Sequence, residues 1–372
     1  MRKSIFTGLF AAILMACFSL PAAALTVAFV NPGKKDEVYW LTASQAMQSA
    51  ADSLGIRLEV FYAERDHLRQ VDIVRMLAAR PVAERPDYVV LGNEKRMGGA
   101  QLKIASEAGI KSFFAYSTIL EEDRGEFGAP RERYKAWIGS LLPQAEDAGY
   151  LTAKALLTRG LRDKRLASDG KLHLLAIAGD RSTESSMLRN AGMERAVKEQ
   201  PLAVLDQVVY ADWRRELGEE KAQELYVRYP QAQLVWAGND LMAFGAMKAL
   251  EGRGGKPGKD KLFSGVNTSP EAMQAVIDGR MEALAGGHFM CGAWALVLIY
   301  DHAKGRDFAG DGLELVQPMF SLFNPPLARH FLEHFRDGVP KIDFRPYSKA
   351  YNPKLKQYDF SFAQLLKTDA VR

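Results

Sequence analysis

Residues 234–250, LVWAGNDLMAFGAMKAL, change from a strand pattern to a helix pattern within a few positions. The apolar run Leu234–Ala237 is typical of a short strand, and Gly238 ends it. From Asp240 onward apolar residues recur at helical spacing, and we expect Asp240 to cap this helix. The Asn239 amide then lies at the carboxyl end of a strand, where open α/β sheets bind ligands. Such a loop can equally be an ordinary turn.

The same alternation repeats along most of the chain. Strands are predicted at 25–30, 57–62, 88–91, 111–115, 136–138, 172–178, 202–209, 234–237, 261–266 and 283–288. Helices are predicted at 41–54, 68–79, 99–108, 143–157 with Pro143 in the first turn, 185–199, 216–229, 240–250, 270–277 and 292–302. Alternating strands and helices pair in parallel, and around ten parallel strands strain one open sheet. The fold class is therefore α/β, with two lobes that each contain an open parallel sheet with helices on both faces.

The regular pattern fades after Gly305. We expect a loop at 318–326, a short helix at 327–335, and a tail at 339–358 with strand-like fragments that lies across the surface. The charged segment 121–135 is expected to be a surface excursion.

The N-terminus has the pattern of a secretory signal. Arg2 and Lys3 precede an apolar run at 5–18, and small residues follow at 22–24. We expect residues 1–24 to be cleaved, leaving a soluble protein in the periplasm that begins at Leu25. The sequence around Cys17 can instead be interpreted as a lipoprotein box, but no polar tether follows it.

Composition and charge exclude several classes of protein. The chain has 372 residues, of which 48% are hydrophobic and 25% are charged, so neither disorder nor a membrane bundle is expected. Loss of Arg2 and Lys3 lowers the formal net charge from +4 to +2, which is too small to indicate nucleic acid as a partner. Cys291 is the only cysteine after cleavage, so no internal disulfide can form. We expect a monomer.

Motifs of catalysis were sought and not found. The glycines at 252–255 follow a helix, so they form a turn and not a dinucleotide loop, and neither a Walker lysine motif nor a G-x-S-x-G motif occurs. We interpret Cys291 as a packed, inert thiol rather than a nucleophile. His330 and His334 have the spacing of metal ligands, but without an evident third ligand we interpret them as a solvated helix face. We therefore expect no catalytic residue, no cofactor and no metal.

Polar and aromatic residues recur at the loops between strands and helices. These are Tyr39, Trp40, Tyr116, Ser117, residues 180–184, Asn239, Asp240, Asn267, Thr268 and His288. Flat rings beside polar groups suit a small polyhydroxylated ligand, because the rings cover its C–H face and the polar groups meet its hydroxyls. We expect Trp40 to stack on the ligand, since a structural tryptophan at this loop would have little to pack on. The alternative is that these turns are polar for structural reasons and that Trp40 belongs to the core.

Five segments together, at 39–51, 137–156, 189–193 (RNAGM), 235–250 and 263–277, resemble periplasmic solute-binding proteins of the ribose-binding type. The resemblance implies two lobes joined by a three-strand hinge that close over a ligand. It places the N-terminal lobe at 25–139 plus 288–318, and the C-terminal lobe with the tail at 140–287 plus 319–372. It also implies that Tyr39 and Trp40 stack on a sugar, that Arg189 clamps it, and that Asn239 and Asn267 occupy amide or acid positions.

Within this family the opening segment 30–40, VNPGKKDEVYW, is similar to the receptor branch for autoinducer-2, which reports to a membrane sensor kinase. Polar ligand-contacting positions of that branch fall here on Lys35 and Glu37. Its second clamping arginine falls on Gly286 or Gly287. These departures indicate a different ligand.

The expected function is therefore a periplasmic receptor that delivers a sugar or sugar-like solute to the membrane subunits of an ABC importer. A ligand-sensing subunit for a membrane sensor protein and an exported enzyme are the alternatives. A DNA-binding regulator is excluded, because the N-terminus carries an export signal where a helix-turn-helix would be required. The expected ligand-binding residues are Tyr39, Trp40, Tyr116, Arg189, Asn239, Asp240, Asn267 and His288.

Overall fold

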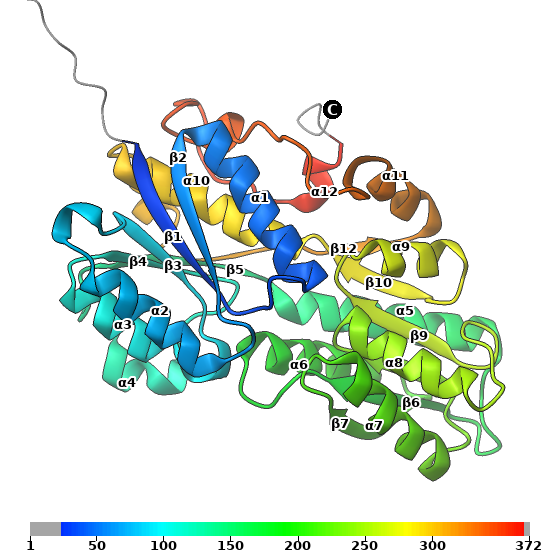
Figure 1. Ribbon diagram of the computed structural model, residues 1–372. Coiled ribbons are helices and arrows are strands. Elements are labelled where there is room, and N and C mark those ends of the chain that lie inside the picture. The colour runs from blue at the N-terminus through cyan, green and yellow to red at the C-terminus, as the bar shows by residue number, and fades with distance from the viewer. Residues whose placement is uncertain (1–23, 368–372) are drawn as a thin grey trace, which may run out of the picture.

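Two six-stranded sheets form the framework of the computed structural model, which describes residues 24–367 (Figure 1). The first sheet has the order β11-β5-β4-β3-β1-β2, and all its paired strands are parallel. Its strands are β1 Leu25–Asn31, β2 Ile56–Tyr62, β3 Tyr88–Leu91, β4 Lys111–Ala115, β5 Trp137–Pro143 and β11 Glu314–Gln317. We call the part built on this sheet the N-terminal lobe.

The second sheet, which forms the C-terminal lobe, has the order β12-β10-β9-β8-β6-β7. Only the pairing of β12 with β10 is antiparallel among its described strands. Its strands are β6 Leu172–Ala178, β7 Ala203–Tyr210, β8 Leu234–Ala237, β9 Leu262–Val266, β10 Ala283–Gly286 and β12 Ser321–Phe323. The predicted fold class, α/β with two lobes, is confirmed.

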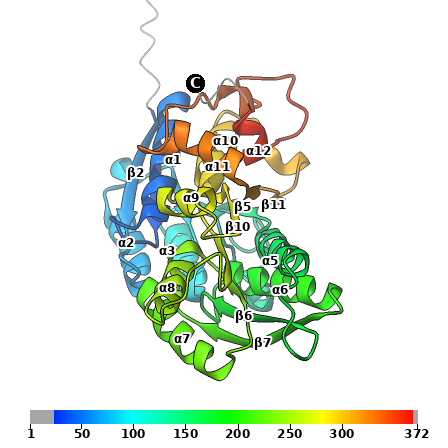
Figure 2. The same cartoon turned by 90° about the vertical axis from the view of Figure 1, so that its right-hand side faces the viewer.

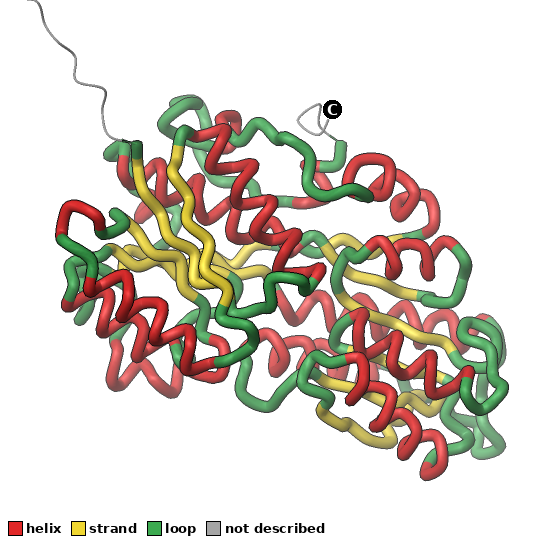
Figure 3. The backbone as a smooth tube through the Cα atoms, in the orientation of Figure 1, coloured by secondary structure: helices red, strands yellow, loops and turns green. Residues whose placement is uncertain are grey.

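Helices cover both faces of each sheet (Figure 3). In the N-terminal lobe they are α1 Val38–Leu54, α2 His67–Ala79, α3 Gly98–Glu107, α4 Arg124–Phe127 and α10 Cys291–Ala303. In the C-terminal lobe they are α5 Ala145–Arg162, α6 Glu184–Glu199, α7 Arg215–Arg228, α8 Asp240–Glu251 and α9 Pro270–Ile277. The short helices α11 Pro325–Phe335 and α12 Phe362–Leu365 follow the second sheet.

Helix ends follow local chemistry. Gly55 ends α1 in the left-handed conformation, with φ 69°, as expected for a glycine at this position. At α8 the capping residue is Asn239, whose side chain accepts the Met242 N–H, so the prediction that Asp240 caps this helix is wrong. Asp240 is instead the first helical residue. The two neighbours are equally good caps by residue type, and the backbone conformation decides between them.

Three segments connect the lobes, at 143–145, 286–291 and 317–321. Pro143 is the last residue of β5 and pairs in register with Gln317, so it does not begin a helix as predicted, and α5 begins at Ala145. The predicted loop at 318–326 contains β12 and the start of α11. Both β11 (ELVQ) and β12 (SLF) were missed, because each has only two apolar residues and lacks the continuous apolar run that marked the four-residue strands β3 and β8.

The tail after Val339 packs on α1 and α10 of the N-terminal lobe as well as on α11, whereas we expected it to belong with the C-terminal lobe (Figure 2). Ser49 and Ser53 on α1 accept the backbone N–H groups of Ile342 and Phe344, each at 2.8 Å. The buried Asp301 carboxylate on α10 accepts the Lys349 N–H at 2.6 Å. The tail therefore covers α1 and α10, and no strand forms between 339 and 358.

The expected export signal, with Cys17, lies outside the described residues except for Ala24. Within residues 24–367, no helix combines the length and the apolar character needed to cross a bilayer. Cys291 is buried and unpaired, its Sγ donates to the Leu141 carbonyl at 3.2 Å, and burial raises the pKa of its thiol to about 12. The thiol is therefore protonated at neutral pH, consistent with an inert cysteine.

Candidate functional site

Seven of the eight expected ligand-binding residues line one cavity between the lobes, and Asp240 does not. This inner cavity has a volume of about 50 Å³, and its walls include Tyr39, Trp40, Tyr116, Arg189, Asn239, Asn267 and His288. A larger outer cavity of about 630 Å³ shares four lining residues with it, namely Glu37, Arg65, Glu94 and Trp213.

Close packing of α5 on α6 holds Arg189 at the cavity. A Cβ atom at Gly149 on α5 would lie 1.8 Å from the Arg189 carbonyl oxygen. A Cβ atom at Gly192 on α6 would lie 2.0 Å from the Glu146 carbonyl oxygen. Because both positions are glycine, the two helices approach closely, and the Arg189 side chain extends to the end of β8.

The Arg189 guanidinium is a buried cation without a carboxylate partner among the described residues. Its Nη1 donates to the Gly238 carbonyl at 2.8 Å, and its Nη2 lies 3.1 Å from His288 Nε2. Burial lowers the pKa of Arg189 to about 10, so the group stays charged at neutral pH. An unpaired buried charge is costly, which marks this residue as a site for a ligand.

His288 is a neutral imidazole with a defined tautomer. Its ring lies between Phe320, at a centroid distance of 4.6 Å, and Tyr39, at 4.8 Å. Burial, with a further contribution from the Arg189 charge, holds its pKa well below the usual value. Since Arg189 donates to Nε2, the ring proton is on Nδ1. His288 Nδ1 and Arg189 Nε are both buried without a partner in the described structure, so two N–H donors are available.

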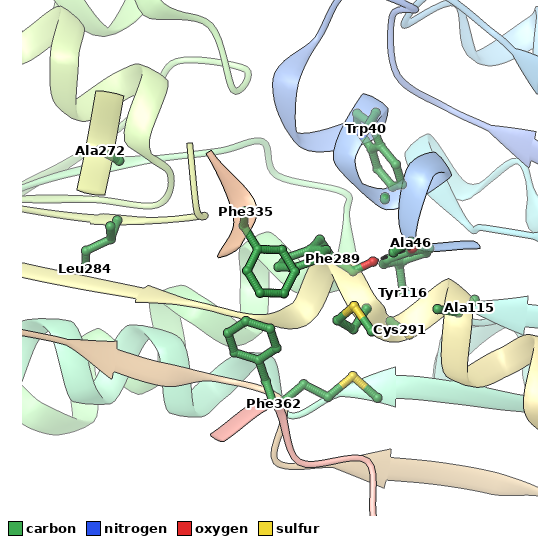
Figure 4. Close-up of a cluster of buried hydrophobic side chains, with 14 of the residues drawn as sticks. Trp40, Ala46, Ala115, Tyr116, Ala272, Leu284, Phe289, Cys291, Phe335 and Phe362 are labelled. Atoms are coloured by element: carbon green, nitrogen blue, oxygen red, sulfur yellow. Dashed lines mark hydrogen bonds between the residues drawn. The ribbon is translucent and has the colours of Figure 1, made fainter. Parts of the chain in front are cut away.

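Trp40 is packed more deeply than we expected (Figure 4). It is 5% exposed and makes edge contacts with Tyr39 at 4.9 Å and Tyr116 at 5.2 Å. Gly33 fits under its ring, where a Cβ atom would come within 2.0 Å. The expectation that a structural tryptophan would have little to pack on is therefore wrong, although the ring still lines the cavity. Stacking of Trp40 on a ligand remains a prediction.

Tyr116 links the N-terminal lobe to the second connection. Its hydroxyl accepts the Gly292 N–H at 3.0 Å and donates to the Phe289 carbonyl at 3.2 Å. Its backbone has φ 71°, an unusual conformation for an aromatic residue. The hydroxyl is thus engaged by the start of α10, and the ring forms the wall of the cavity.

The amides and the carboxylate after β8 and β9 mainly hold the loops together. The Asn239 amide donates to the Trp213 carbonyl at 3.1 Å while its oxygen caps α8. Asp240 accepts from Asn267 Nδ2 at 2.8 Å and from the Ser269 hydroxyl at 2.6 Å. Asp240 does not line the inner cavity, and its carboxylate is hydrogen-bonded to Asn267 and Ser269. Its location therefore does not support the prediction that it contacts the ligand. Asn239 and Asn267 line the cavity and each keeps spare hydrogen-bonding capacity.

Six residues of the inner cavity were not among the expected ligand-binding residues, namely Glu37, Arg65, Glu94, Pro143, Ser185 and Trp213. Three of them, Arg65, Glu94 and Trp213, lie in loops that follow strands. They follow β2, β3 and β7, so the rule that ligands bind at the carboxyl ends of strands applies to them as well. Arg65 and Trp213 have positive φ angles of 63° and 64°, conformations that cluster at functional sites but are not visible in a sequence.

Trp213 is the half-buried aromatic ring of the C-terminal wall. Its Nε1–H donates to Asp180 Oδ2 at 2.8 Å, and Gly179 fits against the ring, where a Cβ atom would lie 2.3 Å away. The Arg189 guanidinium carbon lies 5.5 Å from the ring centroid. Burial opposes ionisation of Asp180, but hydrogen bonds from Thr183, Ser182 and Trp213 outweigh it and lower its pKa.

Glu94 is one of two carboxyl groups, with Glu37, that line both cavities. Burial raises its pKa to about 7, with the Asp180 charge adding to the rise and Arg65 opposing it. Arg65 itself pairs with Glu37, through Nε and Oε2 at 2.8 Å. Glu94 can therefore act as a hydrogen-bond donor or an acceptor near neutral pH.

No arginine side chain fits at Gly286 or Gly287. A Cβ atom at Gly286 would lie 2.5 Å from the Asn267 carbonyl oxygen, and one at Gly287 would lie 2.6 Å from the Met319 carbonyl oxygen. Gly287 also has φ 118°, which favours glycine. The site is therefore built around one arginine from the C-terminal lobe, Arg189.

Comparison with known proteins matches residues 27–307 to the periplasmic binding protein domain. The galactofuranose-binding protein YtfQ of Escherichia coli (strain K12) is 25% identical over 270 residues, which cover 70% of this chain and 77% of that protein. The ribose import binding protein RbsB of Escherichia coli (strain K12) is 24% identical over 282 residues, which cover 76% and 86%.

Among solved structures, a periplasmic sugar-binding protein from Pseudomonas fluorescens is 38% identical, with a TM-score of 0.82. The match covers 92% of this chain and 100% of that chain. The family match covers most of the sequence, and it agrees with the two-lobed fold and with the cavity between the lobes. The chain belongs to the periplasmic binding protein family.

Proposed function

We propose that this protein is a periplasmic receptor that binds a neutral monosaccharide or a similar polyol between its lobes and delivers it to an ABC importer. The main support is the buried pair of Arg189 and His288, which presents two unpartnered N–H donors beside aromatic rings. Hydroxyl and ring oxygens of a sugar accept such hydrogen bonds, and its C–H face packs on rings.

Charge around the cavity favours a neutral ligand. Two cations line the inner cavity, Arg65 and Arg189, and Arg65 is paired with Glu37. Lys95, which lines the outer cavity, is paired with Asp212 at 2.8 Å. Among the described residues of the inner cavity, Arg189 is therefore the cation without a carboxylate partner. The Glu94 carboxyl lies at the same cavity and would repel an anion when ionised. A sugar acid is therefore less favourable than a neutral sugar.

Cavity size supports a ligand that extends between the two spaces. The inner cavity of about 50 Å³ has room for a few atoms, whereas the outer cavity holds about 630 Å³. Glu94 and Trp213 line both cavities. We infer that the ligand reaches from Arg189 and His288 toward Glu94 and Trp213, and that the lobes move to admit it, since contacts made only in the closed state drive closure.

The relatives support the ligand class and the import role. A galactofuranose-binding protein and a ribose import binding protein are similar to most of this chain. The similarity of residues 30–40 to the autoinducer-2 receptor branch favours a second route, in which the same closed form reports to a membrane sensor protein.

A thermal-shift screen tests the proposal. The library should contain pentoses, hexoses, polyols, furanones and sugar acids, each added to the purified mature protein. A ligand at about 100 times its Kd stabilises the fold by about 2.7 kcal/mol, which raises the melting temperature clearly. We expect a neutral sugar to give the largest shift. Stabilisation by a sugar acid alone would overturn the neutral-ligand proposal.

Transport and sensing differ in the cell. We expect deletion of the gene to abolish uptake of the radiolabelled ligand. Expression of the native, ligand-binding protein in the deletion strain should restore uptake. If uptake is unchanged and ligand-dependent gene expression is lost, the receptor serves a sensor and not an importer.

A further inference from the structure

We propose that α11 carries a surface site for a divalent transition metal, with zinc as the preferred ion. The site consists of His330, Glu333 and His334, whose ligand atoms lie within 4.8 Å of one another. The spacing of these residues places them on the same face of the helix. The opposite face, with Phe331 and Phe335, is buried.

Glu333 supplies the third ligand, which was overlooked in the sequence although it lies three positions after His330. Two histidines alone hold a metal weakly, whereas two imidazoles and a carboxylate form a ligand set that zinc uses with water in the fourth position. Imidazole nitrogen also favours zinc, nickel and copper over magnesium or calcium, which prefer oxygen.

Hydrogen bonding of His330 is the second, independent observation. Its Nε2 lies 3.1 Å from the Leu366 carbonyl oxygen, which can only accept, so Nε2 carries the proton. In the neutral ring, Nδ1 then presents a lone pair toward Glu333 Oε2, 3.4 Å away. A proton or a metal ion between these two acceptors would be shared by both.

The spacing of these two atoms suits a metal ion. Two bonds of about 2.1 Å at a tetrahedral angle place their ligand atoms about 3.4 Å apart. The Leu366 carbonyl then acts as the outer partner that metal-bound histidines usually have, because it orients the ring and makes Nδ1 a better ligand.

The location of the site links it to the C-terminal segment. Leu366 follows α12, and Phe362 of α12 packs against Phe289 and Phe335 at 5.4 Å and 6.1 Å (Figure 4). Phe362 also covers Gly287 in the second connection between the lobes. A metal ion at Nδ1 strengthens the hydrogen bond to Leu366 and thereby holds α12 in its packed position.

Calorimetric titration of zinc into the chelator-treated protein, purified without a histidine tag, tests the site. We expect one zinc ion per chain with a Kd in the micromolar range. His334→Ala and Glu333→Gln should each weaken binding at least about tenfold. His67→Ala, which removes an exposed histidine on α2, serves as the matched control and should leave zinc affinity unchanged.

Hydrogen exchange provides a second readout. Zinc should slow amide exchange in residues 362–367 of the native protein, and should not do so in His330→Ala. Absence of binding at millimolar zinc, or equal affinity in the native protein and both ligand variants, would overturn the site. Binding that leaves exchange at 362–367 unchanged would overturn the link to α12. These outcomes do not depend on whether the cleft binds a sugar.

Discussion

Aromatic rings form the wall of the cleft that belongs to the N-terminal lobe, whereas the opposite wall presents hydrogen-bond donors. Tyr39, Trp40 and Tyr116 support one another by edge contacts, and the Tyr116 hydroxyl is engaged by the start of α10. Arg189 and His288 are equally buried but keep unpartnered nitrogen atoms. From this difference we expect one side of the cleft to set its shape and the other to provide hydrogen bonds to a ligand.

The two walls are held in place by different means. The rings belong to a continuous hydrophobic core that includes Phe29, so their positions depend on packing. Arg189 depends on the close approach of α5 and α6, which the glycines at 149 and 192 permit. Substitutions on the ring wall should therefore affect stability first, and substitutions on the donor wall should affect binding first.

Trp40→Ala is expected to have the largest effect. Truncation of a buried tryptophan creates a cavity and should lower the free energy of unfolding by about 3–5 kcal/mol. Chemical denaturation measures this change, and Trp40→Phe, which keeps most of the ring contacts, is the control. The opposite result would be that Trp40→Ala loses less stability than Trp40→Phe but loses much of its ligand affinity. That result would show that Trp40 contacts the ligand and does not support the core.

Arg189→Ala should lower ligand affinity by about 2–4 kcal/mol in titration calorimetry, because a charged donor in a desolvated cleft is removed. Lysine should not restore binding, since a single ammonium cannot contact the Gly238 carbonyl and the ligand in the geometry of a guanidinium. The matched control is Arg195→Ala on the same helix, which removes a surface ion pair with Glu146. Unchanged ligand affinity in a folded Arg189→Ala variant would show that Arg189 does not contact the ligand, and the assignment of polar recognition to this wall would then be wrong.

Glu94→Gln is expected to change the pH dependence of stability. Burial raises the pKa of Glu94 from 4.5 to about 7, so the folded state disfavours the ionised form. The native protein should lose stability relative to the variant as pH rises from about 4.5 to about 7, with no further relative change above that. Because Glu94 is half-buried, we expect about 1–2 kcal/mol.

Denaturation curves of the two proteins at pH 4.5, 6 and 8 measure this difference. Glu84→Gln, at an exposed position, is the control. A constant difference between the native protein and Glu94→Gln over this range would show that the carboxyl is not destabilised by burial.

Trp213→Ala should have the smallest effect. We expect it to weaken the binding free energy by on the order of 0.5–1.5 kcal/mol in addition to the contribution of the apolar area that the ring buries against the ligand. The ring is half-buried and faces Arg189, so it can respond to a ligand without supporting the core. Ligand-induced fluorescence should fall in Trp213→Phe and persist in Trp294→Phe, whose tryptophan packs against Phe360 away from the cleft. If Trp213→Phe keeps the whole signal, an aromatic residue of the other wall contacts the ligand.

Much of the site followed from its position at the ends of strands. Tyr39, Asn267 and His288 were predicted at loops between strands and helices and line the inner cavity, whereas Arg189 was expected from the family resemblance alone. Applied to every strand, the same rule would have included Glu94 after β3 and Trp213 after β7. Their contribution to the cavity was missed because the rule was applied only to loops with an obvious cluster of polar residues.

Atom-level roles could not be read from the sequence. Asp240 and Asn239 are adjacent and chemically similar, yet one binds Asn267 and the other caps α8. Trp40 looked unsupported in its own loop, and its ring packs against Tyr116, which is distant in sequence. The partner of each polar atom depends on which segments the fold brings together.

The sequence by itself determined the alternation of strands and helices, the two-lobed α/β class and the side of the sheets at which the inner cavity lies, because burial imposes a period on each element and crossovers are right-handed. Tertiary structure alone decided that the tail covers α1 and α10, that Arg189 meets His288, and that His330 meets the Leu366 carbonyl. Local patterns report whether a side chain is buried. They do not report its partners, since these come from elements that are brought together only when the chain folds.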